Sequence, residues 1–177
     1  MNIWHDINQD RIKTNDFVTV IEISKGSKAK YELDKETGMI ALDRVLHTSM
    51  QYPANYGFIP RTLSEDGDPL DVLLLCSENI IPGALVRCKS IGAIVMIDDG
   101  EMDEKIIAVA IKDPFYGNFN SITDLPAHYA NEIEHFLASY KGLEKGAKTE
   151  VKKTQGREVA VKLIDEAIER YNKKFKK

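Results

Sequence analysis

Residue types that mark special classes of protein are scarce in this chain of 177 residues. Its two cysteines, Cys76 and Cys88, lie in apolar runs without C-x-x-C spacing, and no histidine is placed to complete a zinc site. We therefore expect two reduced, structural thiols. No apolar stretch approaches the roughly 20 residues that cross a bilayer, and the opening MNIWHDINQD lacks the pattern of a secretory signal. The sequence predicts a cytoplasmic protein without a membrane partner.

An excess of positive charge is also missing. The chain has 24 Lys+Arg against 28 Asp+Glu, a formal net charge of −4, so it has no overall positive field for a nucleic-acid backbone. We expect no nucleic-acid partner. Repeats, low-complexity segments and Pro/Ser-rich linkers are absent as well. A chain of this length and composition fits one globular domain, predicted here to cover residues 1–177.

Short runs rich in β-branched residues predict strands, separated by Gly, Pro or Asp clusters. The runs are 17–23, 39–42, 71–76, 84–88, 91–97 and 106–111. A parallel sheet would need a crossover helix after each strand, and no helical pattern lies between these runs. The strands therefore predict a mostly antiparallel barrel or sandwich.

Helical periodicity appears only after the strands. Apolar residues from Tyr129 to Tyr140 recur at helical spacing, with Asp124 as the predicted N-cap, Pro126 in the first turn and an end near Gly142. A second helical pattern runs from Val159 to Tyr171, toward a Lys-rich tail that suits a helix C-terminus. Strands first and helices last predict the α+β fold class.

Two segments concentrate negative charge. Residues 98–104, DDGEMDE, hold five carboxylates in seven positions, and residues 65–71, EDGDPLD, hold four in seven. Close like charges repel, so such segments are either solvated turns or metal sites. In the second segment Gly67 and Pro69 permit a bend that brings Asp66, Asp68 and Asp71 together. The EF-hand spacing fails, and ligation by oxygen alone favours a hard cation such as Mg²⁺.

Cationic and phenolic residues accompany these carboxylates near the predicted strand ends. Arginine grips phosphate through two parallel donors, lysine supplies a point charge, and tyrosine donates without adding charge. Each one alone is explained as well by a surface salt bridge or a wet strand-end tyrosine. Together they predict a phosphate site, and they are Lys30, Arg44, Tyr52, Tyr56, Lys105, Tyr140 and Lys141.

At these positions the sequence resembles a known family. DGDPLDV at 66–72 is similar to the signature of the soluble inorganic pyrophosphatases of family I, and the likeness runs continuously through YPANYGFIPRTLSEDGDPLDVL at 52–73. Flanking blocks agree in order, including EISKGSKAKYELDKETG at 22–38, IDDGEMDEKIIAV at 97–109 and ITDLPAHYANEIEHFLASYKGLEKG at 122–146. The resemblance covers roughly residues 12 to 146 and thins beyond them.

The resemblance implies a Mg²⁺-dependent hydrolase that converts pyrophosphate to two phosphates. It implies a five-stranded OB-like barrel with additional short strands and two C-terminal helices packed outside. The shortness of the chain resembles the bacterial members, which assemble as homohexamers. Several Mg²⁺ ions would act in each site, with Mn²⁺ or another divalent ion as an alternative.

Residue roles follow from the resemblance position by position. Asp66, Asp71 and Asp103 match inner ligands of the first metal, Asp98 and Asp103 match ligands of a metal that arrives with the substrate, and Glu32 acts through water. Asp68 matches the residue that takes a proton from the attacking water. Phosphate contacts fall to Lys30, Arg44, Tyr56, Lys105, Tyr140 and Lys141. Supporting roles fall to Glu22, Tyr52 and Asp99, where many members carry Glu at the last position.

The chemistry of the residues supports this prediction independently. Pyrophosphate and a carboxylate-rich pocket repel each other until divalent ions lie between them. A metal-bound water loses its proton readily, so hydroxide can attack without a covalent enzyme intermediate. No serine or cysteine has an obvious base partner for the covalent route.

Three other functions compete with pyrophosphate hydrolysis. An OB-like barrel can bind single-stranded nucleic acid, but such surfaces are basic, with exposed stacking aromatics. A structural Ca²⁺ module would explain the aspartates without Lys30, Arg44 or Lys141. A nucleoside-triphosphate hydrolase would share the chemistry, but the sequence has no GxxxxGK[ST] loop.

Overall fold

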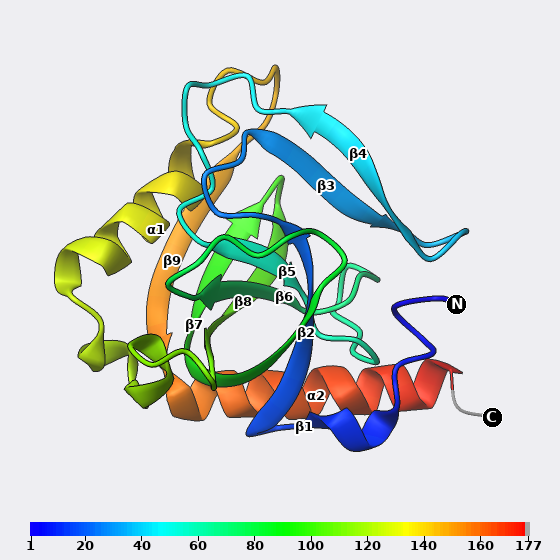
Figure 1. The fold of residues 1–177 in the computed structure, drawn as a ribbon. Helices are drawn as coiled ribbons and strands as arrows, with labels where there is room; N and C mark the ends of the chain where they lie inside the picture. Colours follow the sequence, from blue (N-terminus) through cyan, green and yellow to red (C-terminus); the bar gives the residue numbers. More distant parts are fainter. Residues whose placement is uncertain (176–177) are drawn as a thin grey trace.

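The computed structural model describes residues 1–175 (Figure 1). The strands are β1 (Ile12–Lys13), β2 (Asp16–Ile23), β3 (Ala29–Asp34), β4 (Met39–Val45), β5 (Asn55–Phe58), β6 (Asp71–Leu75), β7 (Leu85–Asp98), β8 (Glu101–Ala110) and β9 (Thr149–Gly156). The helices are α1 (Ala127–Ser139) and α2 (Arg157–Phe175), and the 3₁₀ turns are η1 (Gln9–Arg11), η2 (Tyr116–Asn118) and η3 (Ile122–Asp124). This order of strands before helices confirms the α+β class.

The main sheet closes on itself. Its strands follow the order β1-β2-β5-β6-β8-β7-β9, and an additional pairing of β2 with β7 makes a ring of β2, β5, β6, β8 and β7. The β6–β8 pair is parallel, and the other pairs of the ring are antiparallel. This ring is the predicted five-stranded OB-like barrel, extended by β1 and β9 at its edges.

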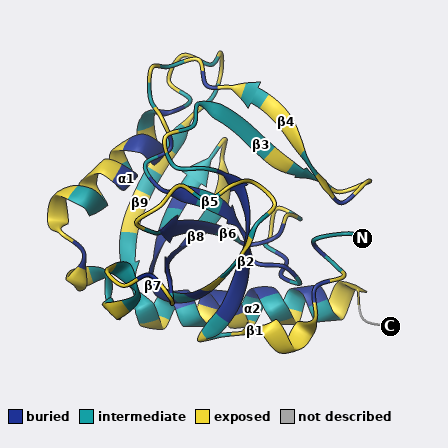
Figure 2. Cartoon of the chain, in the orientation of Figure 1, coloured by how far each residue is buried: buried dark blue, intermediate teal, exposed yellow. Residues whose placement is uncertain are grey.

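Both faces of the ring strands are covered, which explains their nearly continuous apolar sequence. Side chains alternate between the two faces of a strand. In β6, Val72 and Leu74 join one buried cluster, and Leu73 and Leu75 join another. Figure 2 shows much of the barrel in the dark blue of buried residues, with teal and yellow toward the ends of β7 and β8.

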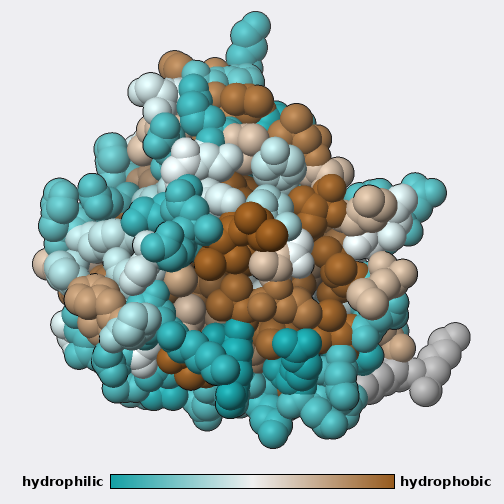
Figure 3. All heavy atoms as spheres, in the orientation of Figure 1, coloured by the Kyte–Doolittle hydropathy of each residue, from teal (hydrophilic) through white to brown (hydrophobic). Residues whose placement is uncertain are grey.

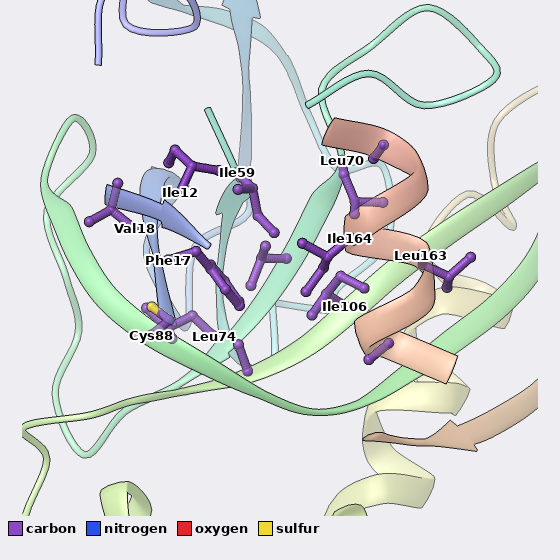
Figure 4. Close-up of a cluster of buried hydrophobic side chains, with 14 of the residues drawn as sticks. Ile12, Phe17, Val18, Ile59, Leu70, Leu74, Cys88, Ile106, Leu163 and Ile164 are labelled. Carbon is purple, nitrogen blue, oxygen red and sulfur yellow. The ribbon is translucent and has the colours of Figure 1, made fainter. Parts of the chain in front are cut away.

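Each of the two clusters is completed by one helix. Leu163 and Ile164 of α2 pack into the first cluster with Leu74 and Ile106, as Figure 4 shows. Ile133, Phe136 and Leu137 of α1 pack into the second. The helices therefore lie on two sides of the barrel, with α2 beneath it and α1 beside β9 (Figure 1).

The β3–β4 hairpin forms a separate two-stranded sheet that extends away from the barrel (Figure 1). Lys30 is paired with Arg44 across this hairpin, next to a register shift between Lys30 and Tyr31. Most of β4 is exposed on the surface. The hairpin thus carries charged side chains to one end of the barrel without adding to the core.

Several sequence predictions need correction. Asp124 is not the N-cap of α1, because that position is Pro126. The Asp124 carboxylate instead caps η3 and accepts the N–H groups of Asn120 and Ser121, which precede this turn. The runs 84–88 and 91–97 belong to one bent strand, β7, with a register shift between Ser90 and Gly92. The strands β1, β3, β5 and β9 were not predicted, because β1 has only two residues and the other three have no clear apolar alternation.

Two further predictions concern membrane-spanning helices and the extent of the domain. No helix within residues 1–175 combines the length and the apolar character needed to cross a bilayer. The extent of the single domain, 1–177, stays a prediction, and residues 176–177 of the Lys-rich tail lie outside the described residues.

Candidate active site

A cavity of about 250 Å³ lies between the β3–β4 hairpin, the edge of the barrel and the loop before β6. Its walls come from β2, β3, β5 and residues 66–71. Among its lining residues are predicted site residues from four separate stretches of the chain: Glu22, Lys30, Glu32, Tyr56, Asp66, Asp68 and Asp71. The fold therefore gathers at this cavity seven of the residues that the sequence singled out, with Lys30 as the one cation among them.

The acidic loop 65–71 bends as predicted. Gly67 has φ +91°, a left-handed conformation that glycine adopts without strain, and a Cβ there would meet no other atom, so the backbone conformation is the reason for glycine. The Asp68 N–H donates to Asp66 Oδ1 at 2.9 Å, and the Ser64 N–H donates to the Asp68 carbonyl at 2.7 Å. Asp66 and Asp68 stay exposed at the mouth of the cavity, while Asp71 lies deeper.

A buried lysine joins the carboxylates beneath the cavity. The Nζ of Lys105 donates to Asp71 Oδ2 at 2.8 Å and to Tyr56 Oη at 2.8 Å, and it lies 3.0 Å from Asp103 Oδ2. The Tyr56 hydroxyl in turn donates to Asp71. Burial on its own lowers the pKa of Lys105, but Asp71, Tyr56 and Asp103 outweigh it and hold this pKa well above its ordinary value. Lys105 is therefore charged at neutral pH.

Strand register explains this convergence. Asp71 begins β6 and is the direct neighbour of Lys105 in the parallel β6–β8 pair. Asp103 precedes Lys105 by two residues in β8, so both side chains lie on the same face of the strand. On that face the β7 partner of Asp103 is Met96, which is followed two residues later by Asp98. One face of the β6–β8–β7 sheet thus presents these four site residues.

Glu22 is a buried carboxylate with few partners. It is 6% exposed, and its Oε1 accepts the Leu33 N–H at 2.8 Å. Burial raises the pKa of Glu22 well above its ordinary value, and the nearby Asp71 carboxylate raises it further. Burial likewise raises the pKa of Asp71, although the Lys105 ammonium opposes the shift. Negative charge is therefore poorly stabilised at this end of the barrel.

A second group of predicted residues lies at the end of α1. The Nζ of Lys141 donates to both carboxylate oxygens of Asp98, at 2.7 and 2.6 Å. Tyr140, which is buried, stacks on Phe136 and has a pKa raised by burial and by the carboxylates of Asp98 and Asp103, although Lys105 opposes the shift. The Tyr140 ring also lies 5.7 Å from the Lys141 Nζ, measured to its centroid.

Arg44 and Tyr52 occupy different surroundings. The guanidinium of Arg44 makes a two-bond ion pair with Glu144, with Nε 2.9 Å from Oε1 and one terminal nitrogen 3.0 Å from Oε2. It also pairs with Asp43, which reaches Lys30 at 3.3 Å. Tyr52 is buried with its ring 5.4 Å from that of Tyr56, measured between centroids. Arg44 thus ties the β3–β4 hairpin to the turn after α1.

Asp99 lies beside Lys141, on the side of the site that meets the connection between α1 and β9. It has φ 49° at the tip of the β7–β8 hairpin, and its Oδ1 accepts the Lys148 N–H at 2.8 Å. Its other oxygen lies 3.7 Å from the Lys141 Nζ. Among the predicted site residues, Asp99 is therefore placed to hold the connection between α1 and β9 next to Lys141.

The donors at the cavity are oxygens, which fit a hard divalent cation. Within residues 1–175, however, no three His, Cys, Asp or Glu side chains approach closely enough to form a ready metal cluster. Lysines lie between the carboxylates, as at Asp71 and Asp103. The raised pKa values of Glu22 and Asp71 support the fit, since a nearby cation would stabilise both anions. The individual ligand assignments stay a prediction.

The sequence did not single out three residues that contact the site. Lys35 pairs with Asp68, Asp43 pairs with Lys30 and Arg44, and Glu144 pairs with Arg44. Arg44 and Glu144 are 100 residues apart in the chain. Spacing in the sequence carries no signal for such pairs, because only the fold brings their partners together.

Comparisons with known proteins agree with this geometry. The family model described as inorganic pyrophosphatase matches residues 19–172. The inorganic pyrophosphatase of Thermus thermophilus has a similar structure, with a TM-score of 0.93 and 37% identity over 97% of this chain and 99% of that one. That of Helicobacter pylori is 42% identical, with a TM-score of 0.88 over 91% and 96% of the two chains. Soluble inorganic pyrophosphatase 4 of Arabidopsis thaliana is 50% identical over 158 residues, which are 89% of this chain and 68% of the relative.

The fold, the acidic cavity and these matches place the chain in the inorganic pyrophosphatase family. Within it, the chain belongs to the soluble family I enzymes and is a hydrolase of the diphosphatase class. It spans about two thirds of the length of the plant relatives, 68% in one case and 65% in another, and nearly the whole length of the bacterial ones. Members of the family depend on divalent metal ions.

Proposed function

We propose that this chain hydrolyses inorganic pyrophosphate to two orthophosphates. The observation that carries the proposal is the placement of Asp71, Asp103 and Lys105 side by side beneath an acidic cavity, in a chain of this family. Pyrophosphate carries several negative charges, and five carboxylates against two lysines line the cavity. Substrate and pocket would repel each other, so the reaction requires positive charge between them.

Divalent cations, with Mg²⁺ as the proposed ion and Mn²⁺ as an alternative, would provide that charge. When bound, they would screen charge on the phosphoryl oxygens and lower the pKa of a bound water. Asp66, Asp71 and Asp103 would hold the first ion, and Asp98 with Asp103 an ion that arrives with the substrate. Glu32 would act through water, and Glu22, Tyr52 and Asp99 support the site.

The lysine side chains of the site form ion pairs with its own carboxylates. Lys105 pairs with Asp71 and Asp103, Lys141 pairs with Asp98, and Lys30 pairs with Glu32. If these carboxylates held metal ions, each lysine would lose a carboxylate partner and could contact phosphate oxygens, while Lys105 would keep Tyr56 and Lys30 would keep Asp43. The proposed phosphate contacts are Lys30, Arg44, Tyr56, Lys105, Tyr140 and Lys141. Metal and substrate would thus bind together through an exchange of partners.

Asp68 is the proposed proton acceptor. It lies at the mouth of the cavity, where water has access, and it pairs with Lys35. A carboxylate within hydrogen-bond reach of the attacking water can orient it and take its proton. The leaving group is itself a phosphate, which Arg44 and Lys141 would stabilise. No covalent enzyme intermediate is needed.

The direct test measures phosphate release from pyrophosphate by the purified chain during Mg²⁺ titration. We expect activity that disappears with exhaustive chelation and returns with Mg²⁺. Asp103→Asn should shift the Mg²⁺ requirement upward or abolish release. The matched control is Glu104→Gln, because Glu104 lies next in β8 but on the opposite face of the strand. Equal activity of the wild type with and without chelator would refute the metal role.

Two further proposals concern assembly and location. We propose a homo-oligomer, with a hexamer expected from the resemblance to bacterial members, in the cytoplasm. Figure 3 shows hydrophobic atoms gathered over the middle of one face, and exposed large apolar side chains include Ile81 at 73% and Leu85 at 38%. Such exposure is typical of surfaces that bind another chain. Light scattering of the purified protein gives the number of subunits directly.

A further inference from the structure

The segment between β5 and the acidic loop is fixed by contacts from distant parts of the chain. The Trp4 indole N–H donates to the Thr62 carbonyl at 2.9 Å, and the Arg61 N–H donates to the Trp4 carbonyl at 3.0 Å. On the other side, Arg170 Nε of α2 donates to the Leu63 carbonyl at 2.8 Å. The start of the acidic loop is therefore anchored to both the N-terminal segment and the C-terminal helix.

The side chain of Thr62 connects the two ends of the acidic loop by hydrogen bonds. Its side chain is 0% exposed, and its hydroxyl makes two hydrogen bonds. The hydroxyl donates to the Ile59 carbonyl at 2.6 Å and accepts the Leu70 N–H at 2.9 Å. The Ile59 N–H also donates to the Leu70 carbonyl at 3.0 Å. One buried hydroxyl thus closes the loop that begins after Thr62 and ends at Leu70, the residue before Asp71.

We propose that Thr62 is a positioning residue for the carboxylates of this loop. Its hydroxyl fixes Leu70, and through Leu70 the start of β6, where Asp71 faces Lys105. The same closure sets the separation between Asp66 and Asp71. Oxygen ligands bind Mg²⁺ well only in near-ideal geometry, so the closure would raise affinity without touching the ion. This inference rests on the proposed metal role of Asp66 and Asp71.

The test compares three variants of buried threonines. Thr62→Val keeps the shape and removes the hydroxyl, and Thr62→Ser keeps the hydroxyl and removes the methyl group. Thr19→Val is the matched control, because Thr19 is also 0% exposed and its hydroxyl has no hydrogen-bond partner among the described residues. For each variant, the Mg²⁺ concentration needed to reach the same stabilisation over the chelated protein, RT ln(1 + [Mg²⁺]/Kd) from Tm, measures ion binding without any need for turnover.

We expect Thr62→Val to require about 10-fold more Mg²⁺ than the wild type, in the range seen when outer partners of metal ligands are lost. Thr62→Ser and Thr19→Val should match the wild type. In kinetics, measured well below the Tm of the chelated variant so that it is folded with or without the ion, Thr62→Val should recover most of its kcat when Mg²⁺ is raised. An unchanged Mg²⁺ requirement in Thr62→Val would overturn the proposal, as would a Thr62→Ser variant as impaired as Thr62→Val.

Amide exchange in the wild type gives a second measurement that does not depend on the folding of Thr62→Val. If the Thr62–Leu70 bond favours metal binding, metal binding must favour the bond to the same degree. Mg²⁺ should therefore slow hydrogen exchange at the Leu70 amide by about 10-fold. This is the same factor as the expected loss of Mg²⁺ affinity in Thr62→Val. An unchanged exchange rate at saturating Mg²⁺ would count against the positioning role. Because both readouts measure binding, they stay separate from the outcome for pyrophosphate hydrolysis.

Discussion

Two buried carboxylates in this molecule have nearly equal exposure and opposite electrostatics. Glu22 at the cavity is 6% exposed and Asp113 in the turn after β8 is 8% exposed. Burial raises the pKa of Glu22 well above its ordinary value. Burial also acts to raise the pKa of Asp113, but the N–H groups of Ser77, Tyr116 and Phe115 outweigh it, and this pKa falls below its ordinary value.

The two carboxylates differ in how many backbone N–H groups donate to them. Asp113 accepts the N–H groups of Ser77 at 2.6 Å, Phe115 at 2.8 Å and Tyr116 at 2.9 Å, and the Ser77 hydroxyl at 3.0 Å. Glu22 accepts one N–H. The fold can therefore satisfy a buried carboxylate when the role is structural. At the cavity it leaves negative charge undersatisfied, a pattern typical of functional sites.

The largest effect is expected for the proposed base at the cavity. Asp68→Asn should lower turnover by about 10²- to 10⁴-fold, because an amide cannot take the proton from water. Phosphate release at saturating Mg²⁺ measures it, and circular dichroism checks the fold. The neighbouring Glu65→Gln, which changes an exposed carboxylate of the same loop, serves as the control and should leave turnover near that of the wild type. Near-normal turnover of Asp68→Asn across the pH range would show that another group takes the proton.

The second effect concerns stability at the cavity without metal. Lys105→Met should destabilise the chelated protein by about 3 kcal/mol, because the carboxylates of Asp71 and Asp103 lose the buried ammonium that pairs with both of them. Urea unfolding in the presence of chelator measures this change. Asp16→Asn, which breaks the exposed pair with Arg87, should cost much less. If both variants lost the same stability, burial would not be what distinguishes the two pairs.

The smallest effect is expected for Asp113, the buried carboxylate outside the cavity. Asp113→Asn should destabilise the protein by roughly 1.5–3 kcal/mol at neutral pH, because charged hydrogen bonds to the backbone are lost. Since the pKa of Asp113 is lower in the folded than in the unfolded protein, its stabilisation is present above the unfolded pKa and is lost as the pH falls toward the folded one. Unfolding at several pH values should show the gap between wild type and variant narrowing below about pH 4. Phosphate release by the variant at moderate temperature should remain, and a gap that widened in acid would contradict the assignment.

Much of the fold follows from the sequence because its core is strongly patterned. The runs 17–23, 71–76 and 106–111 are buried on both faces and appear as β2, β6 and β8. The β9 sequence TEVKKTQG is mostly polar, and it forms a strand because β7 offers a free edge to pair with. Local pattern cannot reveal a strand whose stability comes from its neighbour.

The site also has features that the local sequence predicts and contacts that only the fold creates. The bend at Gly67 is local and was predicted from the residues themselves. The pairing of Arg44 with Glu144, or of Asp68 with Lys35, depends on where the hairpin and the turn after α1 meet. Composition and motif thus indicated which residue types act together, and the fold determines which of them touch.

The parallel β6–β8 pairing makes the chemistry of this protein sensitive to the count of residues. Lys105 faces Asp71 because of its exact place in the β8 ladder. One residue inserted or deleted between the tip of the β7–β8 hairpin and Lys105 would bring Glu104 or Ile106 opposite Asp71, an acid or an aliphatic group where an ammonium now lies. Evolution can exchange side chains on this strand more readily than it can change the length of the hairpin.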